Sequence, residues 1–511
     1  MILWLLVITA LLYLAMFRFR RRRLYKLASL LPSPDSELPV LGIAYKFAGN
    51  TEHIMNAVKA INYETMKNNG ILRAWIGPNL FIVLVNPADV EYLMKNYLEK
   101  GDYHRFTRAI LGNGGIFAPV SIWRRRRKVM VPLFSPKIVE TFVEVFSKQS
   151  EHLVKLLSSY ANTGEISMWP FLSSYTLDSV CETTMGVKIN AQGNPNTPFL
   201  LAMNTLLPLV SERYFQIWLQ PDWLYKFFPK YKHHELNKKK LHDFTDEVIK
   251  KKREEQKTDM KNKTESDNEY DLGNYQTKTF LDHLINLSGG EEGYTNLELR
   301  EETLTLAVAG TDTSAVATGF TMTLLAKYPH IQEKVYQELH EIFGDSERPL
   351  VKEDLLKMKY LDRVVKETMR LYPPVPMIIR KVEQDLKLPS GHLLPAGAIV
   401  AIQIWGVHHD AKYWGPTVEE FDPDRFLPER FNLAHPCSFM PFSHGPRNCV
   451  GYQYAIMSVK SVLSAVIRRY KLVGEPEKTA IPHIRCKVDV MLKAVDGYKL
   501  SLERRKPEKS V

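Results

Sequence analysis

The pattern of apolar and polar positions divides the chain into a short apolar N-terminus, a mainly helical body and several short strands. Residues 79–90, NLFIVLVNPADV, begin with a continuous apolar run that predicts a buried strand, which Pro87 ends at the start of a helix. Between about 130 and 250 the periodicity is mainly helical. From 380 to 405, short apolar runs separated by PSG and PAG predict short strands and hairpins. These patterns together predict a mainly α fold with a smaller β region.

The longest predicted helix starts at Thr295, which forms a capping box with Glu298, and runs without proline for roughly nine turns at about 3.6 residues per turn. Its middle, LAVAGTDTSAVATG, is apolar and small on all sides, which predicts a helix through the centre of the body. Thr311, Asp312 and Thr313 place polar groups in this apolar stretch. One interpretation is that the hydroxyl groups bond back to carbonyls of their own helix. The other is a functional role.

A second helix is predicted over YLDRVVKETMRLYPP, with apolar residues on one face. Glu367 and Arg370 lie three residues apart on the other face, where they can pair directly. On this pattern alone, an exposed pair that contributes almost nothing to stability is the simplest interpretation.

Two segments lack periodicity. Residues 250–274 are charged, polar and nearly free of large aliphatic side chains, which predicts a mobile surface loop. Residues 421–431, FDPDRFLPERF, are aromatic and rich in proline. Because long irregular segments inside compact domains are usually functional, the second segment is a candidate part of a site.

The N-terminus indicates a membrane anchor. Residues 2–17 are apolar except for Thr9, and RFRRRR follows at once. This run is near the lower length limit for crossing a bilayer, and its positive charge follows rather than precedes it, which favours an uncleaved anchor over a signal peptide. The positive-inside rule then places the body in the cytosol. We expect a transmembrane anchor at 1–17, a basic stop-transfer and proline-rich hinge at 18–42, and a catalytic domain at 43–511.

Composition excludes some classes and leaves others open. The 511 residues include only four cysteines with no close CxxC pair, so neither a disulfide framework nor a zinc ribbon is encoded. The formal charge of +11 is compatible with nucleic acid, an anionic membrane or an acidic protein partner. Charge alone does not choose between these partners.

Cys449, in PFSHGPRNCVGYQYA, is the candidate reactive residue. A cysteine nucleophile paired with His444 would need an oriented acid, and none is identifiable. A zinc site is a second possibility, but its spacing matches no common ligand pattern; its ligands would be His435, Cys437, His444 and Cys449. The third is an axial thiolate to haem iron, which needs a sulfur in a loop at a helix N-terminus.

The residues around Cys449 fit the third possibility. Gly445 and Gly451 would let the backbone approach a flat macrocycle, and Arg447 would neutralise a haem propionate. The run FSHGPRNCVG, which begins at Phe442, resembles the haem-binding signature of the cytochrome P450 superfamily. The resemblance implies that haem lies between the long central helix and the loop that holds Cys449.

Other motifs of the same family follow in order. ETMR resembles the helix motif in which Glu367 and Arg370 join an arginine of the later FDPDRF segment, here Arg425. AGTDTS resembles the oxygen-activating motif, which implies that Thr313 and Asp312 lie over the iron and deliver protons. The haem-propionate contacts that the resemblance implies outside the signature are Trp123 and Arg127 of WRRRR, and Arg380. With the anchor and hinge, the resemblance covers nearly the whole chain.

Within the superfamily, CETTMG and the Cys449 segment look most like the insect and vertebrate family 4 group that includes fatty-acid omega-hydroxylases. Many members of that group have a glutamate that becomes esterified to the haem, at the position of Ala309 here. We therefore expect haem b held only by Cys449 and noncovalent contacts. The same departure weakens the inference to terminal fatty-acid hydroxylation.

The resemblance implies a monooxygenase that inserts one oxygen atom of O2 into an apolar small molecule. No flavin or dinucleotide fingerprint is present, so electrons would come from another protein. The resemblance implies a membrane-bound NADPH-dependent reductase, with cytochrome b5 as a further partner. The basic run Arg124 to Lys128 is a candidate docking surface for an acidic donor. We expect the protein at the endoplasmic reticulum membrane, and nucleic acid has no support beyond net charge.

Two other functions stay open. Haem-thiolate isomerases and dehydratases need no reductase and tend to lose the threonine of the oxygen motif, which Thr313 retains here. A non-catalytic haem-binding protein would not need the proton-delivering groups either. The wall facing the substrate is expected near 105–120, 200–220 and 373–379, but similar apolar linings serve fatty acids, hormones, odorants and xenobiotics.

Overall fold

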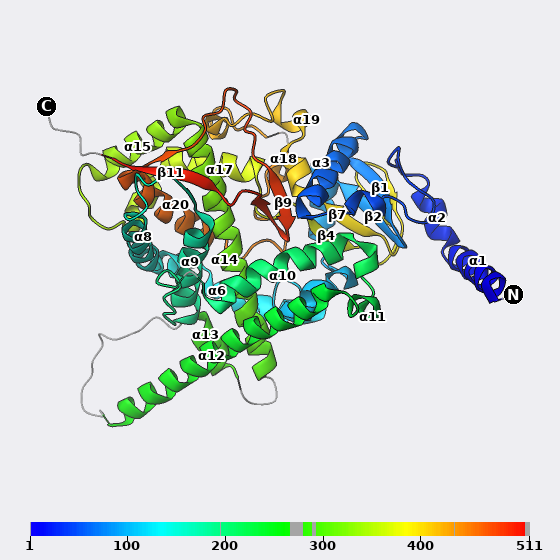
Figure 1. Ribbon diagram of the computed structural model, residues 1–511, viewed down its shortest axis with the longest axis horizontal. Coiled ribbons are helices and arrows are strands. Elements are labelled where there is room, and N and C mark those ends of the chain that lie inside the picture. Colours follow the sequence, from blue (N-terminus) through cyan, green and yellow to red (C-terminus); the bar gives the residue numbers. More distant parts are fainter. Residues whose placement is uncertain (1, 195, 266–278, 289–292, 434, 506–511) are drawn as a thin grey trace.

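A computed structural model describes residues 2–194, 196–265, 279–288, 293–433 and 435–505. Helices make up most of the body, and a small sheet lies at the end from which the N-terminal helix projects (Figure 1). The α-helices are α1 Ile2–Arg20, α2 Arg22–Ala28, α3 Thr51–Lys67, α4 Pro87–Asn96, α5 Arg105–Leu111, α6 Val120–Leu133, α7 Pro136–Thr141, α8 Val143–Leu157, α9 Trp169–Val180, α10 Pro198–Phe215, α11 Asp222–Tyr225, α12 Pro229–Glu265, α13 Phe280–Asn286, α14 Asn296–Lys327, α15 Pro329–Phe343, α16 Lys352–Lys357, α17 Lys359–Leu371, α18 Ile404–His408, α19 Ala411–Trp414 and α20 Tyr452–Arg469. The predicted mainly α fold is confirmed.

The largest sheet joins distant parts of the chain. Its order is β1 (Ile71–Ile76), β2 (Asn79–Leu84), β7 (Ile399–Ile402) and β4 (Ile378–Lys381). β1 and β2 form an antiparallel hairpin, whereas β2 and β7 pair in parallel, with Phe81 opposite Ile399. The strand predicted from residue 79 and the short strands predicted within 380–405 are both confirmed.

The remaining strands form three small sheets. They are β3 Glu165–Ser167 with β11 Lys499–Arg504 and β8 Tyr470–Val473, then β9 Cys486–Asp489 with β10 Met491–Ala494, and β5 Leu386–Lys387 with β6 Leu393–Leu394. Each is too short to be stable alone and depends on packing against helices.

Helix α14 passes through the centre of the molecule, as its apolar pattern predicts. The capping box is present, since the Thr295 hydroxyl accepts from the Glu298 backbone N–H and the Glu298 carboxylate accepts from the Thr295 N–H. Most of its residues are buried, and it packs against α9, α12, α17 and α20. The cap fixes where the helix begins, and the surrounding helices stabilise its apolar middle.

Helix α17 corrects one sequence interpretation. Glu367 and Arg370 are both fully buried and form a 2.7 Å ion pair, so the interpretation of an exposed pair is wrong. Arg425 lies in the 3-10 helix η5, Pro423–Phe426, and its Nε atom is 3.5 Å from a Glu367 oxygen. The spacing of charged residues on a helix cannot reveal that another segment covers them, whereas the resemblance to the family motif predicted this three-residue group.

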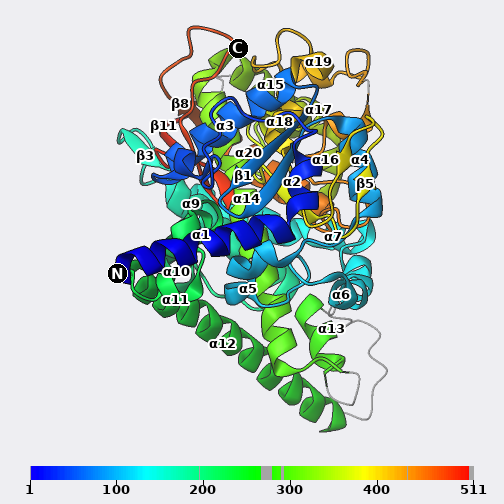
Figure 2. The same ribbon diagram turned by 90° about the vertical axis from the view of Figure 1, so that its right-hand side faces the viewer.

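The segment expected as a mobile loop over 250–274 is also corrected. Helix α12 continues through residue 265, and 266–278 lie outside the described residues. Figure 2 shows α12 as a long helix along one edge of the molecule, and it packs on α10. Lys, Arg, Glu and Gln are good helix formers, so a polar segment without aliphatic residues extends a helix that has already started.

The N-terminal segment is helical but short. Helix α1 contains the apolar run to Phe17 and then continues into arginines, while the proline-rich residues 32–42 are not helical. Across the described residues, none of the helices combines the length and apolar character needed to cross a membrane. The transmembrane anchor expected at 1–17 stays a prediction.

Candidate functional site

A large internal cavity lies between the middle of α14 and the loop that precedes α20. Its volume is about 410 Å³, and its lining side chains are predominantly apolar. Residues from α14 on one side, including Thr313, and Cys449 on the other both line it. A cavity enclosed by a central helix and a loop-borne sulfur has the arrangement that a haem-thiolate site needs.

Cys449 is held in place by the backbone of its own loop. Its N–H donates to the Phe442 carbonyl at 2.9 Å, and Gly451 is the N-cap of α20. Cys449 is exposed and lines the cavity, and desolvation by the surrounding protein raises the pKa of the thiol, while the Gly451 N–H and the Arg127 charge oppose that rise. A donor N–H at a helix N-terminus favours the thiolate form that binds iron.

Gly445 was expected to let the backbone approach haem, but the structure shows that it is needed for a close contact with α4. Its φ is +72°, and a Cβ atom there would lie 2.7 Å from the carbonyl oxygen of Met94 in α4. Only glycine fits this left-handed, crowded position without strain. Gly445 does not line the cavity, so it shapes the loop, whereas Phe442 and Gly451 of the same motif do line the cavity.

Two buried arginines reach the cavity from opposite parts of the chain. Arg380 in β4 is 1% exposed and donates from Nη1 to the Ile379 carbonyl, and its Nε has no partner within the described part of the chain. Arg447 donates to the carbonyls of Leu98 and Ala118, and its guanidinium lies 4.8 Å from the Trp123 ring centre. Burial lowers the pKa of each arginine to about 10.

Arg127 connects helix α6 to the Cys449 loop. Its guanidinium donates to the Asn448 carbonyl oxygen at 3.0 Å and to the Asn448 side-chain oxygen at 2.7 Å. It lines the cavity together with Trp123, as the WRRRR motif predicts. Arg127 can therefore hold the loop and still present positive charge to the cavity.

Two further residues that line the cavity were not predicted from the sequence. Lys100 and His104 line the cavity, and both are in the connection between α4 and α5. Burial, reinforced for Lys100 by Arg380 and Arg447, lowers the pKa of both side chains well below its usual value. No motif surrounds them, so the only sequence signal was their position near the expected substrate wall at 105–120.

The basic side chains that line the cavity suit the two propionates of haem. Among the described residues, Arg380, Arg447 and Lys100 form no ion pair, and no Asp or Glu lines the cavity. Buried cations without carboxylate partners are costly, and an anionic ligand removes that cost. The donor set, with a cysteine sulfur at the cavity wall and unpaired cations at its edge, therefore suits iron protoporphyrin.

On α14, Thr313 and Asp312 point to different surroundings. The Thr313 hydroxyl donates to the Ala309 carbonyl at 2.7 Å and lines the cavity, so backbonding and a functional position occur together. Asp312 is fully buried, does not line the cavity, and pairs with Lys493 of β10 at 2.7 Å. Burial raises the pKa of Asp312, and Lys493 opposes that rise. Lys493 is a residue that no motif indicated.

The structure thus brings most of the predicted site residues to one cavity. Those that line it are Thr313, Cys449, Trp123, Arg127, Arg380, Arg447, Phe442 and Gly451, and those that do not are Asp312 and Gly445. The three expected wall segments all contribute, and residues of α3, β1, β2 and β9 complete the wall. Of these elements, only the strand from residue 79 was predicted, and its apolar pattern indicated burial but not a cavity.

Comparison with known proteins agrees with this geometry. A family model described as Cytochrome P450 matches residues 32–501. The chain is 32% identical over 503 residues to Cytochrome P450 4c3 of Drosophila melanogaster, covering 97% of this chain and 93% of that protein. It is also 32% identical over 445 residues to Cytochrome P450 4V2 of Homo sapiens, covering 86% and 84%. The chain therefore belongs to the cytochrome P450 family, whose members are haem-thiolate monooxygenases that insert one oxygen atom of O2 into apolar small molecules.

Proposed function

We propose that this monooxygenase oxidises an apolar small molecule at a membrane, with Cys449 as the residue whose thiolate would hold haem iron and Thr313 as the proton-delivering group. The observation that supports these roles is that both residues line one apolar cavity, from opposite sides. When bound, haem supplies the activation of dioxygen, and a thiolate ligand favours cleavage of the O–O bond.

The propionate-binding roles belong to Arg380, Arg447, Arg127 and Trp123, with Lys100 as an additional cation. Charge-assisted hydrogen bonds are the strongest that these side chains can make, and each of the three arginines is already oriented by a backbone carbonyl or by Asn448. We propose that the haem is held noncovalently. Ala309 has no carboxyl group to esterify, and the cavity lining of the described residues contains no other carboxyl side chain.

Proton delivery is assigned to Thr313, with Asp312 as its acid. The Thr313 hydroxyl can rotate from the Ala309 carbonyl toward a group inside the cavity. Asp312 is oriented away from the cavity by Lys493, so it would act only through water and after that ion pair loosens.

The membrane arrangement is a further part of the proposal. Residues 1–17 attach the protein to the endoplasmic reticulum membrane, 18–42 connect, and 43–511 form the catalytic domain on the cytosolic side. Exposed apolar side chains support membrane contact by α1, namely Ile2, Trp4, Leu5, Ile8, Leu11 and Leu12. The arginines that follow suit an anionic lipid surface.

A member of this family needs a redox partner, and we propose an NADPH-dependent reductase, assisted by cytochrome b5. The candidate surface on α6 needs one correction, because Arg126 is 3% exposed and pairs with Glu301 and Glu302. Arg124, Arg125 and Lys128 are exposed, and because Arg125 pairs with Glu298, we propose Arg124 and Lys128 as the contacts for an acidic donor.

The first test is the difference spectrum of reduced, carbon monoxide-bound protein. A strongly red-shifted Soret band is expected in the wild type and in Cys486→Ala, which removes a buried thiol outside the cavity. Cys449→His should give the band of histidine-ligated haem or no haem. A normal thiolate band in the Cys449 variant would contradict the assignment.

The second test separates Thr313 from an equivalent threonine on the same helix. Thr318 also bonds back to a carbonyl of α14, at 2.8 Å, but does not line the cavity. With a substrate found by turnover screening, Thr313→Ala should lower product formed per NADPH several-fold and release hydrogen peroxide, whereas Thr318→Ala should not. Equal coupling in both variants would contradict the role of Thr313.

A further inference from the structure

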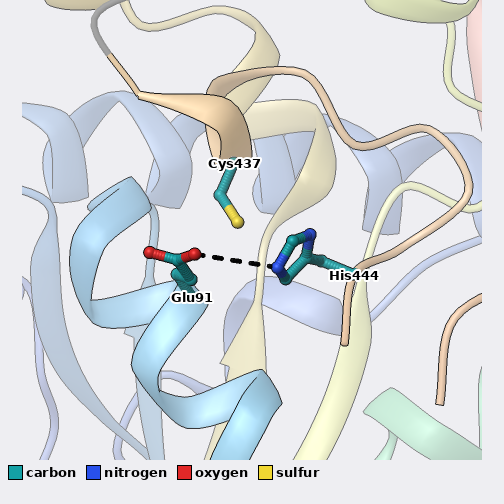
Figure 3. A group of neighbouring side chains, drawn as sticks. All are labelled: Glu91, Cys437 and His444. Carbon is teal, nitrogen blue, oxygen red and sulfur yellow. Dashed lines mark ion pairs between the residues drawn. The ribbon is translucent and has the colours of Figure 1, made fainter. Parts of the chain in front are cut away.

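A group of three metal-ligating side chains lies outside the cavity, on the far side of the Cys449 loop. Glu91 belongs to α4, Cys437 to the 3-10 helix η6 (Pro436–Ser438), and His444 to the loop itself. One ligand atom of each lies within 4.8 Å of the others, and none of the three lines the cavity. Figure 3 shows the Cys437 sulfur directed into the space between the Glu91 carboxylate and the His444 ring.

We propose that this group is a zinc site in which the Cys437 sulfur, the His444 Nε2 atom and a Glu91 oxygen bind the ion. The combination of thiolate, imidazole and carboxylate suits Zn²⁺, whereas Mg²⁺ and Ca²⁺ prefer oxygen ligands alone. Three protein ligands leave a fourth tetrahedral position for water.

The separation of the His444 and Glu91 ligand atoms is close to the separation that they would have around one zinc ion. His444 Nε2 is 3.8 Å from Glu91 Oε1. Ligand atoms bound to tetrahedral zinc at about 2.0–2.3 Å are roughly 3.3–3.8 Å apart. The His444 and Glu91 side chains are 33% and 27% exposed, so an ion can enter from solvent, while Cys437 forms the closed floor of the site.

A neighbouring histidine orients the carboxylate instead of binding the ion. The Cys437 N–H donates to Nδ1 of His435 at 3.1 Å, which leaves the ring proton of a neutral His435 on Nε2. That Nε2 atom lies 3.2 Å from Glu91 Oε2, the oxygen that would not bind the ion. Outer contacts of this kind orient ligating carboxylates in metal sites. His435 is therefore a positioning residue.

The structure also replaces one ligand of the zinc site considered from the sequence. Cys449 lies at the cavity, and Glu91, which is more than 300 residues earlier in the chain, takes its place. Burial, followed by the Glu91 charge, raises the pKa of Cys437 to about 12. The thiol is protonated at neutral pH without metal, so zinc binding forms the Zn–S bond and releases that proton to solvent.

Lys95 competes with a metal ion for this site. Its ammonium group is 2.6 Å from Glu91 Oε1, the same oxygen that faces His444. The Lys95 side chain is 54% exposed and one helical turn away, so it can move into solvent when an ion binds. A pair of this kind contributes little to stability, so its loss does not prevent zinc binding. Removing Lys95 should strengthen binding.

Zinc would connect α4 directly to the segment that ends at the axial cysteine. His444 is in the same loop as Cys449, and Gly445 of that loop contacts the last turn of α4. A bound ion stabilises the state that binds it by mass action, so the folded holoprotein should become more resistant to heat as zinc is added.

The test uses full-length, detergent-solubilised holoprotein, freed of any affinity tag and dialysed against buffered ZnSO4. We expect one zinc per chain by elemental analysis. X-ray absorption at the zinc edge, which haem iron does not affect, should show one sulfur neighbour at about 2.3 Å together with nitrogen or oxygen neighbours. Only nitrogen and oxygen neighbours would overturn the site.

Variants give opposite directions of change. His444→Gln and Cys437→Ala should each weaken zinc binding at least tenfold, whereas Lys95→Met should strengthen it several-fold. Matched controls are His340→Gln, a partly exposed histidine of α15, and Cys486→Ala, a buried cysteine of β9, and both should keep the wild-type affinity. The carbon monoxide spectrum checks that each variant is folded.

Two further outcomes would refute the proposal. One is an unchanged zinc affinity in His444→Gln protein that retains its thiolate spectrum. The other is a Lys95→Met affinity equal to or weaker than that of the wild type. The Lys95 variant keeps the test decisive even if Cys437→Ala does not fold, because it alters an exposed side chain and predicts a gain.

Discussion

Two groups of buried arginines differ in what neutralises them. Arg370 pairs with Glu367 through two short hydrogen bonds, at 2.7 and 2.8 Å, and also donates to the carbonyls of His408 and Glu420. Arg425 reaches the same carboxylate and two carbonyl groups of the covering segment. This group is complete without any ligand.

Arg380 and Arg447 are equally enclosed, but their acceptors in the chain are neutral carbonyl groups. The Nε atom of Arg380 has no acceptor among the described residues. Burial lowers the pKa of both arginines, which shows that their charged forms are poorly compensated. The difference between the groups separates a structural ion pair from a binding site for an anion.

The largest effect should come from breaking the complete group. Glu367→Gln leaves two buried guanidinium groups without their carboxylate, which should cost about 3–5 kcal/mol of unfolding free energy. Urea unfolding and the yield of haem-containing protein measure the loss. Glu353→Gln removes an exposed carboxylate and is the matched control. Wild-type stability in Glu367→Gln would contradict the structural role.

Removing an arginine from the second group, Arg380 and Arg447, should not lower the stability of the haem-free protein. Arg380→Met removes a cation that has no carboxylate partner, so the haem-free protein should be as stable as the wild type or more stable. Haem binding should weaken by about 10- to 100-fold, equivalent to a charge-assisted hydrogen bond of about 1.5–3 kcal/mol. Unfolding of the haem-free protein and the rate of haem transfer to an acceptor protein measure the two effects. A loss of stability equal to that of Glu367→Gln would contradict the comparison.

A third buried arginine has the reverse imbalance. Arg126 is surrounded by Glu298, Glu301 and Glu302. Burial raises the pKa of Glu302 to about 7 from its ordinary value of 4.5. Between these values the folded protein holds a proton that the unfolded chain has lost, so stability falls as pH rises from about 4.5 to 7. Glu302→Gln should flatten that fall by about 1–3 kcal/mol.

Urea unfolding at a series of pH values measures this slope. Glu301→Gln is the control, because Glu301 contacts the same guanidinium and lies next to Glu302 in the chain. It should leave most of the slope in place, because burial contributes more than the Glu301 charge to the raised pKa of Glu302. An equal slope in the wild type and Glu302→Gln would contradict the assignment.

The smallest effect is expected for Arg124, an exposed arginine of helix α6. Arg124→Glu should leave stability within about 0.5 kcal/mol of wild type, since exposed substitutions away from networks rarely do more. If α6 docks an acidic donor, reductase-driven turnover should fall several-fold at low salt and recover at high salt. Steady-state turnover over a salt series measures this, and an equal loss at every salt concentration would argue against docking.

The sequence predicted those parts of the site that depend on local spacing. Cys449 at a helix N-terminus and the capped central helix with Thr313 were located by their neighbours in the chain. Pairing between distant segments was not predictable in this way. The contact of Lys493 with Asp312 depends on how β10 meets α14, and that of Glu91 with His444 on how the Cys449 loop meets α4.

The local pattern of polar residues also gave two wrong predictions, one about burial and one about a loop. Glu367 and Arg370 have the spacing of a surface pair but are buried by the segment around η5. Residues 250–265 have the composition of a loop but continue α12, because an existing helix extends easily through charged helix formers. In both places the deciding factor was the neighbouring structure and not the residues themselves.

The parallel pairing of β2 with β7 has a consequence for how the protein is made. The β1–β2 hairpin is complete early in synthesis, but Phe81 cannot meet Ile399 until most of the chain has left the ribosome. At about 5–20 residues per second, the hairpin waits for tens of seconds with one edge unpaired. Such an edge is open to pairing with other chains. The N-terminal sheet is therefore the region where chaperone binding and aggregation during translation should concentrate.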